Sequence, residues 1–223
     1  MSRTEYLLSF DVAHKSLAVC LLEVVSWTQP VQLAIASILL DPQRNSKEKL
    51  QQCMRMLAGA RVLHLEVINL LGAKKVKDTS LVERGQALRA ALSRMDSLVE
   101  HLRPHVLVEY QMSANDKSRL QSAQILYHYT ALPVQVHLVG PSLKQSVRFG
   151  SQSIRDFLAT HRSNYCANKA HSRSLLKSWA AMYDPQCIRG IPAKHMDDAA
   201  DAFLMAIAWY AKQSQREGRH YLL

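Results

Sequence analysis

Carboxylates stand at the ends of three apolar segments of this chain. Asp11 closes the first apolar run, Glu109 closes a later one, and Asp197, Asp198 and Asp201 open a third. Hard divalent cations such as Mg²⁺ take oxygen ligands, so acids from separate elements that meet at one point would form a metal site. Two such ions about 4 Å apart can activate a water and stabilise the leaving oxygen in phosphodiester hydrolysis.

The three acids of the last segment have two possible explanations. Carboxylates in a first helical turn interact favourably with the helix dipole and cap free amides. Three acids at i, i+3 and i+4 spacing would also repel one another, and a divalent cation would offset that repulsion. The spacing places either Asp198 and Asp201 or Asp197 and Asp201 on one face, and it leaves the choice between these pairs open. Because His and Cys do not stand at ligand spacing, zinc is not predicted.

The elements that would position these acids begin with a β-rich amino-terminal part. Residues 6–10 and 17–27 are apolar runs around a polar turn, which predicts a β-hairpin. A third strand at 31–40 would complete an antiparallel meander, and a further short strand is possible at 62–70. Residues 41–60 are more polar and could form either a helical insertion or a lid.

Helices and strands alternate in the remainder of the chain. The pattern Ser80-x-x-Glu83 predicts a capping box at the start of a helix that ends before Pro104. Its apolar positions include Leu81, Leu88, Leu92, Met95, Val99 and Leu102. A buried strand at 105–109 that ends in Glu109 and a strand at 134–139 then favour a mixed α/β sheet. The other predicted helices span residues 116–129, 153–161, 170–183 and 197–213.

Charge and composition favour one globular domain with a polyanionic partner. The chain has 223 residues, is 48% hydrophobic, and carries 28 Lys+Arg against 18 Asp+Glu, for a formal charge of +10. Such a balance favours nucleic acid or an anionic surface as the partner. No long apolar run or signal peptide is evident, and four scattered cysteines indicate reduced thiols, so we expect a single domain over 1–223 that is intracellular and not membrane-bound.

Two amino-terminal and central motifs resemble a known family. Residues 8–18 read LSFDVAHKSLA, which is similar to the first-strand motif D-x-G-x-K-N-L-A of poxvirus and iridovirus Holliday-junction resolvases, relatives of bacterial RuvC. Ala13 replaces the glycine of that motif and Ser16 replaces the asparagine. Residues 106–112 read VLVEYQM and resemble the family's I-x-E-x-Q-M segment, in which Glu109 takes the place of the catalytic glutamate.

Two later motifs extend the resemblance. Residues 141–145 read PSLKQ, similar to the family's segment with a lysine near the scissile phosphate, and the matching residue is Lys144. Residues 194–202 read KHMDDAADA and resemble K-x-D-D-x-x-D-A/S, in which the second Asp and the Asp three residues later are catalytic. The resemblance therefore selects Asp198 and Asp201, and its motifs span the chain from about residue 7 to residue 209.

The resemblance implies an RNase H-like fold, which is an α/β arrangement of a five-stranded mixed sheet flanked by helices. It implies a Holliday-junction resolvase that makes paired symmetric nicks in four-way DNA junctions. The implied catalytic residues are Asp11, Glu109, Lys144, Asp198 and Asp201, of which the four acids would ligate two Mg²⁺ ions that Mn²⁺ can replace.

The implied partners are branched DNA and a second copy of the chain. A homodimer matches the two-fold symmetry of the junction, and the apolar face of the helix at 80–102 could form the dimer surface or pack onto its own sheet. A poxvirus-like source would place the protein in the host cytoplasm. Basic residues expected to contact the DNA backbone are Lys15, Lys74, Lys75, Lys77, Lys117, Arg119, Lys144, Lys169, Arg173 and Lys177.

Two other functions remain open from the sequence. One is another RNase H-like nuclease that acts on RNA–DNA hybrids or on general branched DNA. The other is a non-catalytic junction-binding protein that keeps the fold without the chemistry. The presence of all four acids favours an enzyme over the binding protein.

Overall fold

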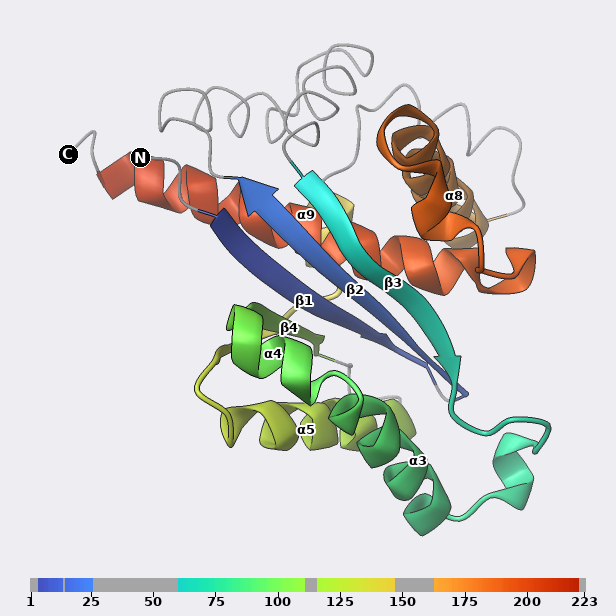
Figure 1. Ribbon diagram of the computed structural model, residues 1–223. Coiled ribbons are helices and arrows are strands. Elements are labelled where there is room, and N and C mark those ends of the chain that lie inside the picture. The colour runs from blue at the N-terminus through green and yellow to red at the C-terminus, as the bar shows by residue number, and fades with distance from the viewer. Residues whose placement is uncertain (1–3, 14, 26–59, 111–115, 147–162, 221–223) are drawn as a thin grey trace.

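A single mixed β-sheet organises the protein. The computed structural model describes residues 4–13, 15–25, 60–110, 116–146 and 163–220. Within these ranges, five strands form one sheet in the order β3-β2-β1-β4-β5 (Figure 1). The strands are β1 (Thr4–Val12), β2 (Ser16–Val25), β3 (Ala60–Asn69), β4 (His105–Glu109) and β5 (Gln135–Val139).

The sheet is antiparallel on one side of β1 and parallel on the other. β1 pairs with β2, and β2 with β3, in antiparallel register, whereas β1 and β4, and β4 and β5, run parallel. The mixed five-stranded sheet confirms the fold class expected from the sequence. The carboxyl ends of β1, β4 and β5 therefore lie at one edge of the sheet, where the chain leaves each strand.

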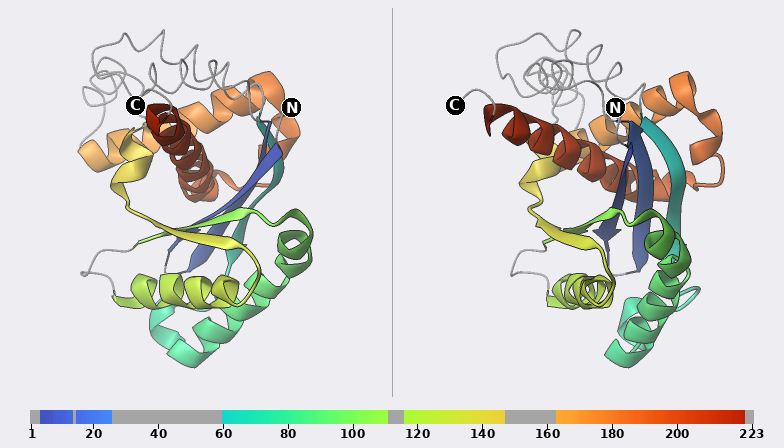
Figure 2. Two further views of the ribbon diagram at one scale, coloured as in Figure 1. Left: turned by 90° about the vertical axis from the view of Figure 1, so that its left-hand side faces the viewer. Right: turned by 60° about the vertical axis from the view of Figure 1, so that its left-hand side comes forward.

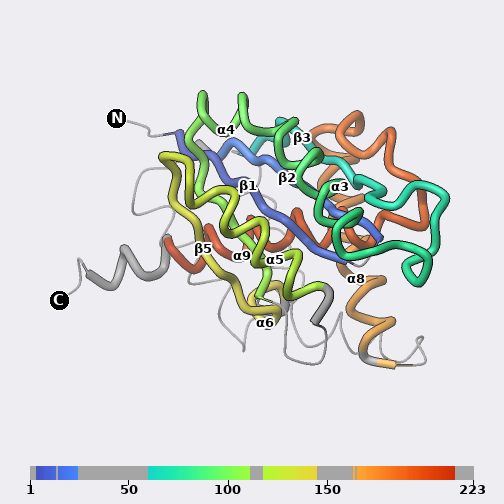
Figure 3. The backbone as a smooth tube through the Cα atoms, turned by 90° about the horizontal axis from the view of Figure 1, so that it is seen from below, coloured from blue at the N-terminus to red at the C-terminus, as the bar shows by residue number. Residues whose placement is uncertain are grey.

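Helices cover both faces of the sheet, as Figure 2 shows. One face carries α8 (Asn164–Tyr183) and α9 (Met196–His220). The opposite face carries α3 (Leu81–Ser93), α4 (Asp96–Leu102) and α5 (Asp116–Thr130), which overlie the strands in Figure 3. The short α6 (Ser142–Ser146) follows β5. In the described part of the chain, 3₁₀ turns lie in connections at Val76–Asp78, Pro185–Ile188 and Ala193–His195.

Because both faces are covered, the central strand β1 buries residues on both sides. Leu7 packs with α8 and α9, while Leu8 and Phe10 pack with α3, α4 and α5. Trp179 of α8 lies 5.1 Å from the Phe203 ring of α9, measured between ring centroids. These two cores hold the sheet between helical layers and fix where each strand end lies.

Helix α9 lies close against the sheet because its inner surface is made largely of alanine. Ala199, Ala202 and Ala206 are fully buried. The hydroxyl of Ser9 on β1 donates to the Ala202 carbonyl at 2.7 Å. This contact ties the start of α9 to the middle strand, near the end where Asp11 lies.

The structure corrects several boundaries predicted from the sequence. The segment at 60–69, expected only as a possible extra strand, is the strand that pairs with β2, and residues 31–40, 41–60 (apart from Ala60) and 153–161 lie outside the described residues. The helix predicted to begin at residue 170 begins at Asn164.

The helix predicted over 80–102 is divided into α3 and α4. The Met95 amide donates to the Leu92 carbonyl at 2.8 Å, a tighter bond that interrupts the α-helical pattern. α4 ends at Leu102, and the following Arg103 takes a left-handed conformation with φ 48°, which is common where a helix ends, just before Pro104. Among the described residues, no helix combines the length and the apolar character that a membrane span needs.

Candidate active site

Two of the predicted acids lie side by side on adjacent strands. The parallel register pairs Phe10 with Val108, so Asp11 and Glu109 occupy the next position on β1 and β4. Side chains alternate along a strand, and these acids share the face of Leu7 and Leu107, which contacts α9. Both residues are buried, at 8% and 5% exposure. The strand ends thus aim two carboxylates at the first turn of α9.

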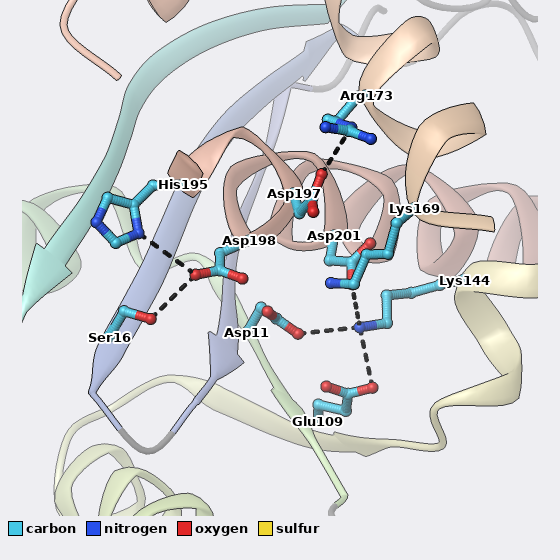
Figure 4. Close-up of polar contacts among 10 residues, drawn as sticks. All are labelled: Asp11, Ser16, Glu109, Lys144, Lys169, Arg173, His195, Asp197, Asp198 and Asp201. Carbon is cyan, nitrogen blue, oxygen red and sulfur yellow. Dashed lines mark hydrogen bonds and ion pairs between the residues drawn. The ribbon is translucent and has the colours of Figure 1, made fainter. Parts of the chain in front are cut away.

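Lys144 lies at the centre of the carboxylates. Its Nζ is 2.9 Å from Asp11 Oδ1, 3.0 Å from Glu109 Oε1 and 3.4 Å from Asp201 Oδ2 (Figure 4). The four side chains are all at most 15% exposed. One ammonium group therefore bridges acids from β1, β4 and α9.

The position of Lys144 follows from the turn after β5. The chain leaves β5 at Val139 and enters α6, where the Leu143 amide donates to the Gly140 carbonyl at 2.9 Å. Leu143 is buried in the core with α9, which anchors the short helix. Because α6 is anchored at the parallel strand ends, its next residue, Lys144, points at the acids.

A second lysine reaches the same cluster from α8. Lys169 Nζ donates to Asp201 Oδ2 at 2.8 Å, so Asp201 is shared between two ammonium groups. One turn further along α8, Arg173 Nε lies 2.8 Å from Asp197 Oδ1. Lys169 and Arg173 were expected to contact DNA, but in the structure both pair with acids of α9.

Asp198 lies on the other side of the cluster. The hydroxyl of Ser16 at the start of β2 donates to Asp198 Oδ2 at 3.0 Å, and His195 Nδ1 lies 3.8 Å from the same oxygen. Sequence reasoning assigned no contact to Ser16 or His195. The contact of His195 could have been inferred from its position three residues before Asp198. Asp197 instead faces Arg173, so the geometry groups Asp198 and Asp201 with the strand acids.

Burial and crowding change the proton affinities of these groups. Burial, reinforced by the nearby Asp11 carboxylate and opposed by Lys144, raises the pKa of Glu109 to about 7. Burial likewise raises the pKa of Asp198, although the Ser16 hydroxyl acts against it. Burial alone would lower the pKa of Lys144, but three carboxylates outweigh it and raise that pKa. The raised pKa values of Glu109 and Asp198 mean that neighbouring cations and hydrogen bonds do not fully offset the cost of burying these two carboxylates.

The donor atoms of the cluster fit a hard divalent cation. Among the described residues, no three acidic, His or Cys side chains form a group that could hold a metal ion, and the Lys144 ammonium lies among the acids. All four acids offer carboxylate oxygens, the donors that Mg²⁺ prefers. Four carboxylates against two ammonium groups also leave two negative charges uncompensated if all are ionised. The carboxylates are therefore suitable metal ligands by their chemistry, and the Lys144 ammonium occupies the position between three of them.

A cleft of about 200 Å³ opens onto the cluster between α6 and α8. Glu109, Lys144, Lys169 and Asp201 line it, with Tyr165 of α8 in its wall. Tyr165 is 70% exposed, and Lys169 Nζ lies 5.9 Å from the centre of its ring. The cleft gives a phosphate-sized group access to the acids and to both lysines. Tyr165 was not predicted as a site residue.

The other residues expected to contact DNA lie in the β1–β2 turn, in the loop after β3 and on helices α5 and α8. Lys15 lies in the β1–β2 turn beside the Asp11 end of the sheet, and its carbonyl accepts from the Leu70 amide at 2.8 Å, which places the loop after β3 nearby. In that loop Lys74 pairs with Glu83 at 2.9 Å. Four more of these side chains are exposed: Lys75 and Lys77 in the same loop, Arg119 on α5 and Lys177 on α8. The side chain of Lys117 lies outside the described residues.

Neither a family model nor a curated protein matches this sequence. Solved structures do match. The fowlpox virus resolvase, determined with its substrate Holliday-junction DNA, has 12% identity and a TM-score of 0.51 over 93% of this chain and 98% of its own. RuvC of Thermus thermophilus has 16% identity and a TM-score of 0.49 over 96% of both chains, and its structure with a Holliday-junction substrate has 14% identity, a TM-score of 0.49, and 94% and 97% coverage.

At this level of identity the likeness concerns the arrangement of the backbone. The match to the fowlpox virus resolvase covers nearly the whole of both chains, so it includes the mixed sheet in the order β3-β2-β1-β4-β5 and the helices on its two faces. This chain therefore has the RNase H-like fold that it shares with the fowlpox virus resolvase.

Proposed function

We propose that this protein is a metal-dependent endonuclease that resolves four-way DNA junctions. The observation that carries the proposal is the meeting of Asp11, Glu109, Asp198 and Asp201 at one end of an RNase H-like sheet, beside an open cleft. The sequence motifs around these acids resemble those of junction resolvases. The fowlpox virus resolvase, which shares the fold, was determined with a Holliday junction.

In this proposal the four acids hold divalent metal ions, with Mg²⁺ as the ordinary ion and Mn²⁺ as a substitute. Bound metal would supply an activated water and would neutralise charge on the leaving oxygen. Lys144 binds the phosphate that enters the cleft and stabilises negative charge that develops on it. Ser16 orients the Asp198 carboxylate through their 3.0 Å hydrogen bond.

The formal charge of +10 supports a polyanionic substrate. Lys15 and the basic loop after β3 lie at the same edge of the sheet as the acids, where they can contact backbone phosphates on one side of the cleft. Such contacts release counterions from DNA, so junction binding should weaken steeply as salt is raised. Recognition of the junction would come from its shape rather than from base sequence.

We also propose that the active form is a homodimer, because a four-way junction has two-fold symmetry and two opposed strands must be cut. The apolar face of α3, considered from sequence as a dimer surface, packs on its own sheet through Leu88 and Leu92, which are fully buried. Leu81 and Val82 at its first turn remain exposed. The dimer surface is thus not the buried face of α3, and light scattering of the purified protein tests the dimer itself.

Substrate competition tests the proposed activity. A labelled immobile four-way junction is incubated with the protein and Mg²⁺ while an unlabelled junction, an RNA–DNA hybrid or a linear duplex is added in excess. Only the unlabelled junction should suppress nicking strongly. Suppression mainly by the hybrid would keep the metal nuclease but change its substrate. Tight junction binding with no nicks in Mg²⁺ or Mn²⁺ would support the non-catalytic alternative instead.

A further inference from the structure

Two lysines lie where cations are needed within the carboxylate cluster. The Lys144 ammonium contacts three acids, and the Lys169 ammonium contacts Asp201, the acid that both lysines share. Their side chains are only 15% and 19% exposed. Buried carboxylates that lacked a positive partner would be costly, so these ammonium groups stabilise the cluster when no metal is present.

A metal ion and the Lys144 ammonium cannot occupy the cluster together as the side chains stand. The ammonium is already within 3.4 Å of one oxygen from each of Asp11, Glu109 and Asp201. A divalent cation bound to the same oxygens would be in repulsive contact with it in a poorly screened site. Metal binding therefore requires the Lys144 ammonium to leave the acids. A metal bound to Asp201 also weakens the attraction between Asp201 and the Lys169 ammonium.

The cleft provides the place to which both lysines can move. Lys144 and Lys169 approach it from opposite walls, on α6 and α8, and both line it already. Each has a flexible four-carbon stem that can turn the ammonium away from the acids without moving the helix. The described acids that line the cleft, Glu109 and Asp201, would then be bound to metal, so an ammonium released into the cleft would need another counter-anion. A DNA phosphate that enters the cleft would provide one.

We propose that Lys144 and Lys169 are exchangeable internal cations that occupy the carboxylate cluster in the free protein and turn to the DNA phosphate when metal ions replace them. This inference rests on the proposed function and adds a coupling between metal binding and DNA binding. Metal binding frees the lysines for phosphate, and phosphate binding removes the cations that compete with metal. Since such coupling is reciprocal, metal should strengthen junction binding and the junction should strengthen metal binding by the same factor.

The first experiment measures Mn²⁺ binding in the absence of DNA, from the loss of the free Mn²⁺ signal in electron paramagnetic resonance. Lys144→Met and Lys169→Met keep an unbranched, flexible side chain of similar length and remove its charge. Lys212→Met is the matched control, because Lys212 is exposed on α9 outside the cluster. We expect Lys144→Met to bind Mn²⁺ at least about fivefold more tightly than wild type, the lower end of typical coupling. Lys169→Met should show a smaller gain and Lys212→Met no gain.

The second experiment measures junction affinity by fluorescence anisotropy in Ca²⁺ and in EDTA. Wild type should bind the junction more tightly in Ca²⁺, and this ratio should fall toward one in Lys144→Met because the exchangeable cation is gone. Equal Mn²⁺ affinity in wild type and both lysine variants would overturn the proposal while leaving the metal nuclease intact. If Lys144→Met does not fold, the Mn²⁺ affinity of Lys169→Met is compared with that of wild type and decides the question. Absence of Mn²⁺ binding by wild type and by both lysine variants would reject the proposed function together with this inference.

Discussion

Removal of the Lys144 ammonium should destabilise the metal-free protein in a pH-dependent way. In Lys144→Met, Asp11, Glu109 and Asp201 lose a cation that lies 2.9, 3.0 and 3.4 Å from their oxygens. The loss of one partner from a buried ion pair costs about 3–5 kcal/mol when the remaining charge is uncompensated. Protonation of an acid relieves part of this cost, so we expect a loss of about 3 kcal/mol at pH 8.

The sign of the pH dependence follows from Glu109. Its pKa in the folded protein is about 7, raised chiefly by burial from an ordinary value of 4.5. A group with a raised folded pKa stabilises the fold fully below its unfolded pKa, and that contribution is lost as pH rises toward the folded value. Without Lys144 the pKa of Glu109 should rise further. The deficit of Lys144→Met should therefore be large at pH 8 and smaller at pH 5.5.

Thermal unfolding in EDTA measures this deficit. For a chain of this size 1 kcal/mol corresponds to roughly 2–4 °C in Tm, so Lys144→Met should melt roughly 6–12 °C below wild type at pH 8. Lys212→Met serves as the control and should melt within about 2 °C, since substitutions at exposed sites change stability by at most about 0.5 kcal/mol. If Lys144→Met and wild type had the same Tm at pH 8, the Lys144 ammonium would not be stabilising the buried acids.

Three further substitutions test other parts of the structure. Ser16→Ala removes the hydrogen bond to Asp198 and should slow single-turnover junction nicking by roughly tenfold while junction binding is kept; an unchanged rate would contradict the orienting role. Ser80→Ala removes the capping box of α3 and should lower the free energy of unfolding in urea by about 1 kcal/mol, whereas no shift would mean that the cap is not needed. Burial and the neighbouring His105 lower the pKa of His137, so wild type should lose stability in urea as pH falls below 6.5, and His137→Gln should lose less; equal losses would contradict this.

Asp11 and Glu109 could be predicted from sequence because each closes an apolar element, whereas spacing left Asp197 and Asp198 open and only the resemblance selected Asp198 with Asp201. Parallel strands carry their ends to the same edge, so Asp11 and Glu109 meet by topology alone. Asp198 and Asp201 start a helix whose residues from Ala202 to Ala211 are all buried, which makes the presence of acids there conspicuous. The mixed α/β sheet could be predicted because strand and helix patterns alternate along the chain, and the RNase H-like arrangement was implied by the resemblance.

The partners of these acids could not be predicted, because they depend on how distant elements pack. Lys169 and Arg173 read as surface cations on an amphipathic helix, and only the packing of α8 against α9 turns them toward Asp201 and Asp197. The pairing of β2 with residues 60–69 likewise depends on contacts across a long stretch of chain, about which local periodicity carries no information. The division of α3 from α4 has no proline or glycine to signal it.

The most direct test of the central claim is nicking of an immobile four-way junction by wild type and Asp198→Asn, each in Mg²⁺ and in EDTA. Each strand is labelled in turn so that every cut is mapped. The account predicts paired cuts at symmetric positions on two opposed strands, only with wild type and only in Mg²⁺, while Asp198→Asn still binds the junction. Equal nicking by Asp198→Asn, or nicking that persists in EDTA, would contradict it.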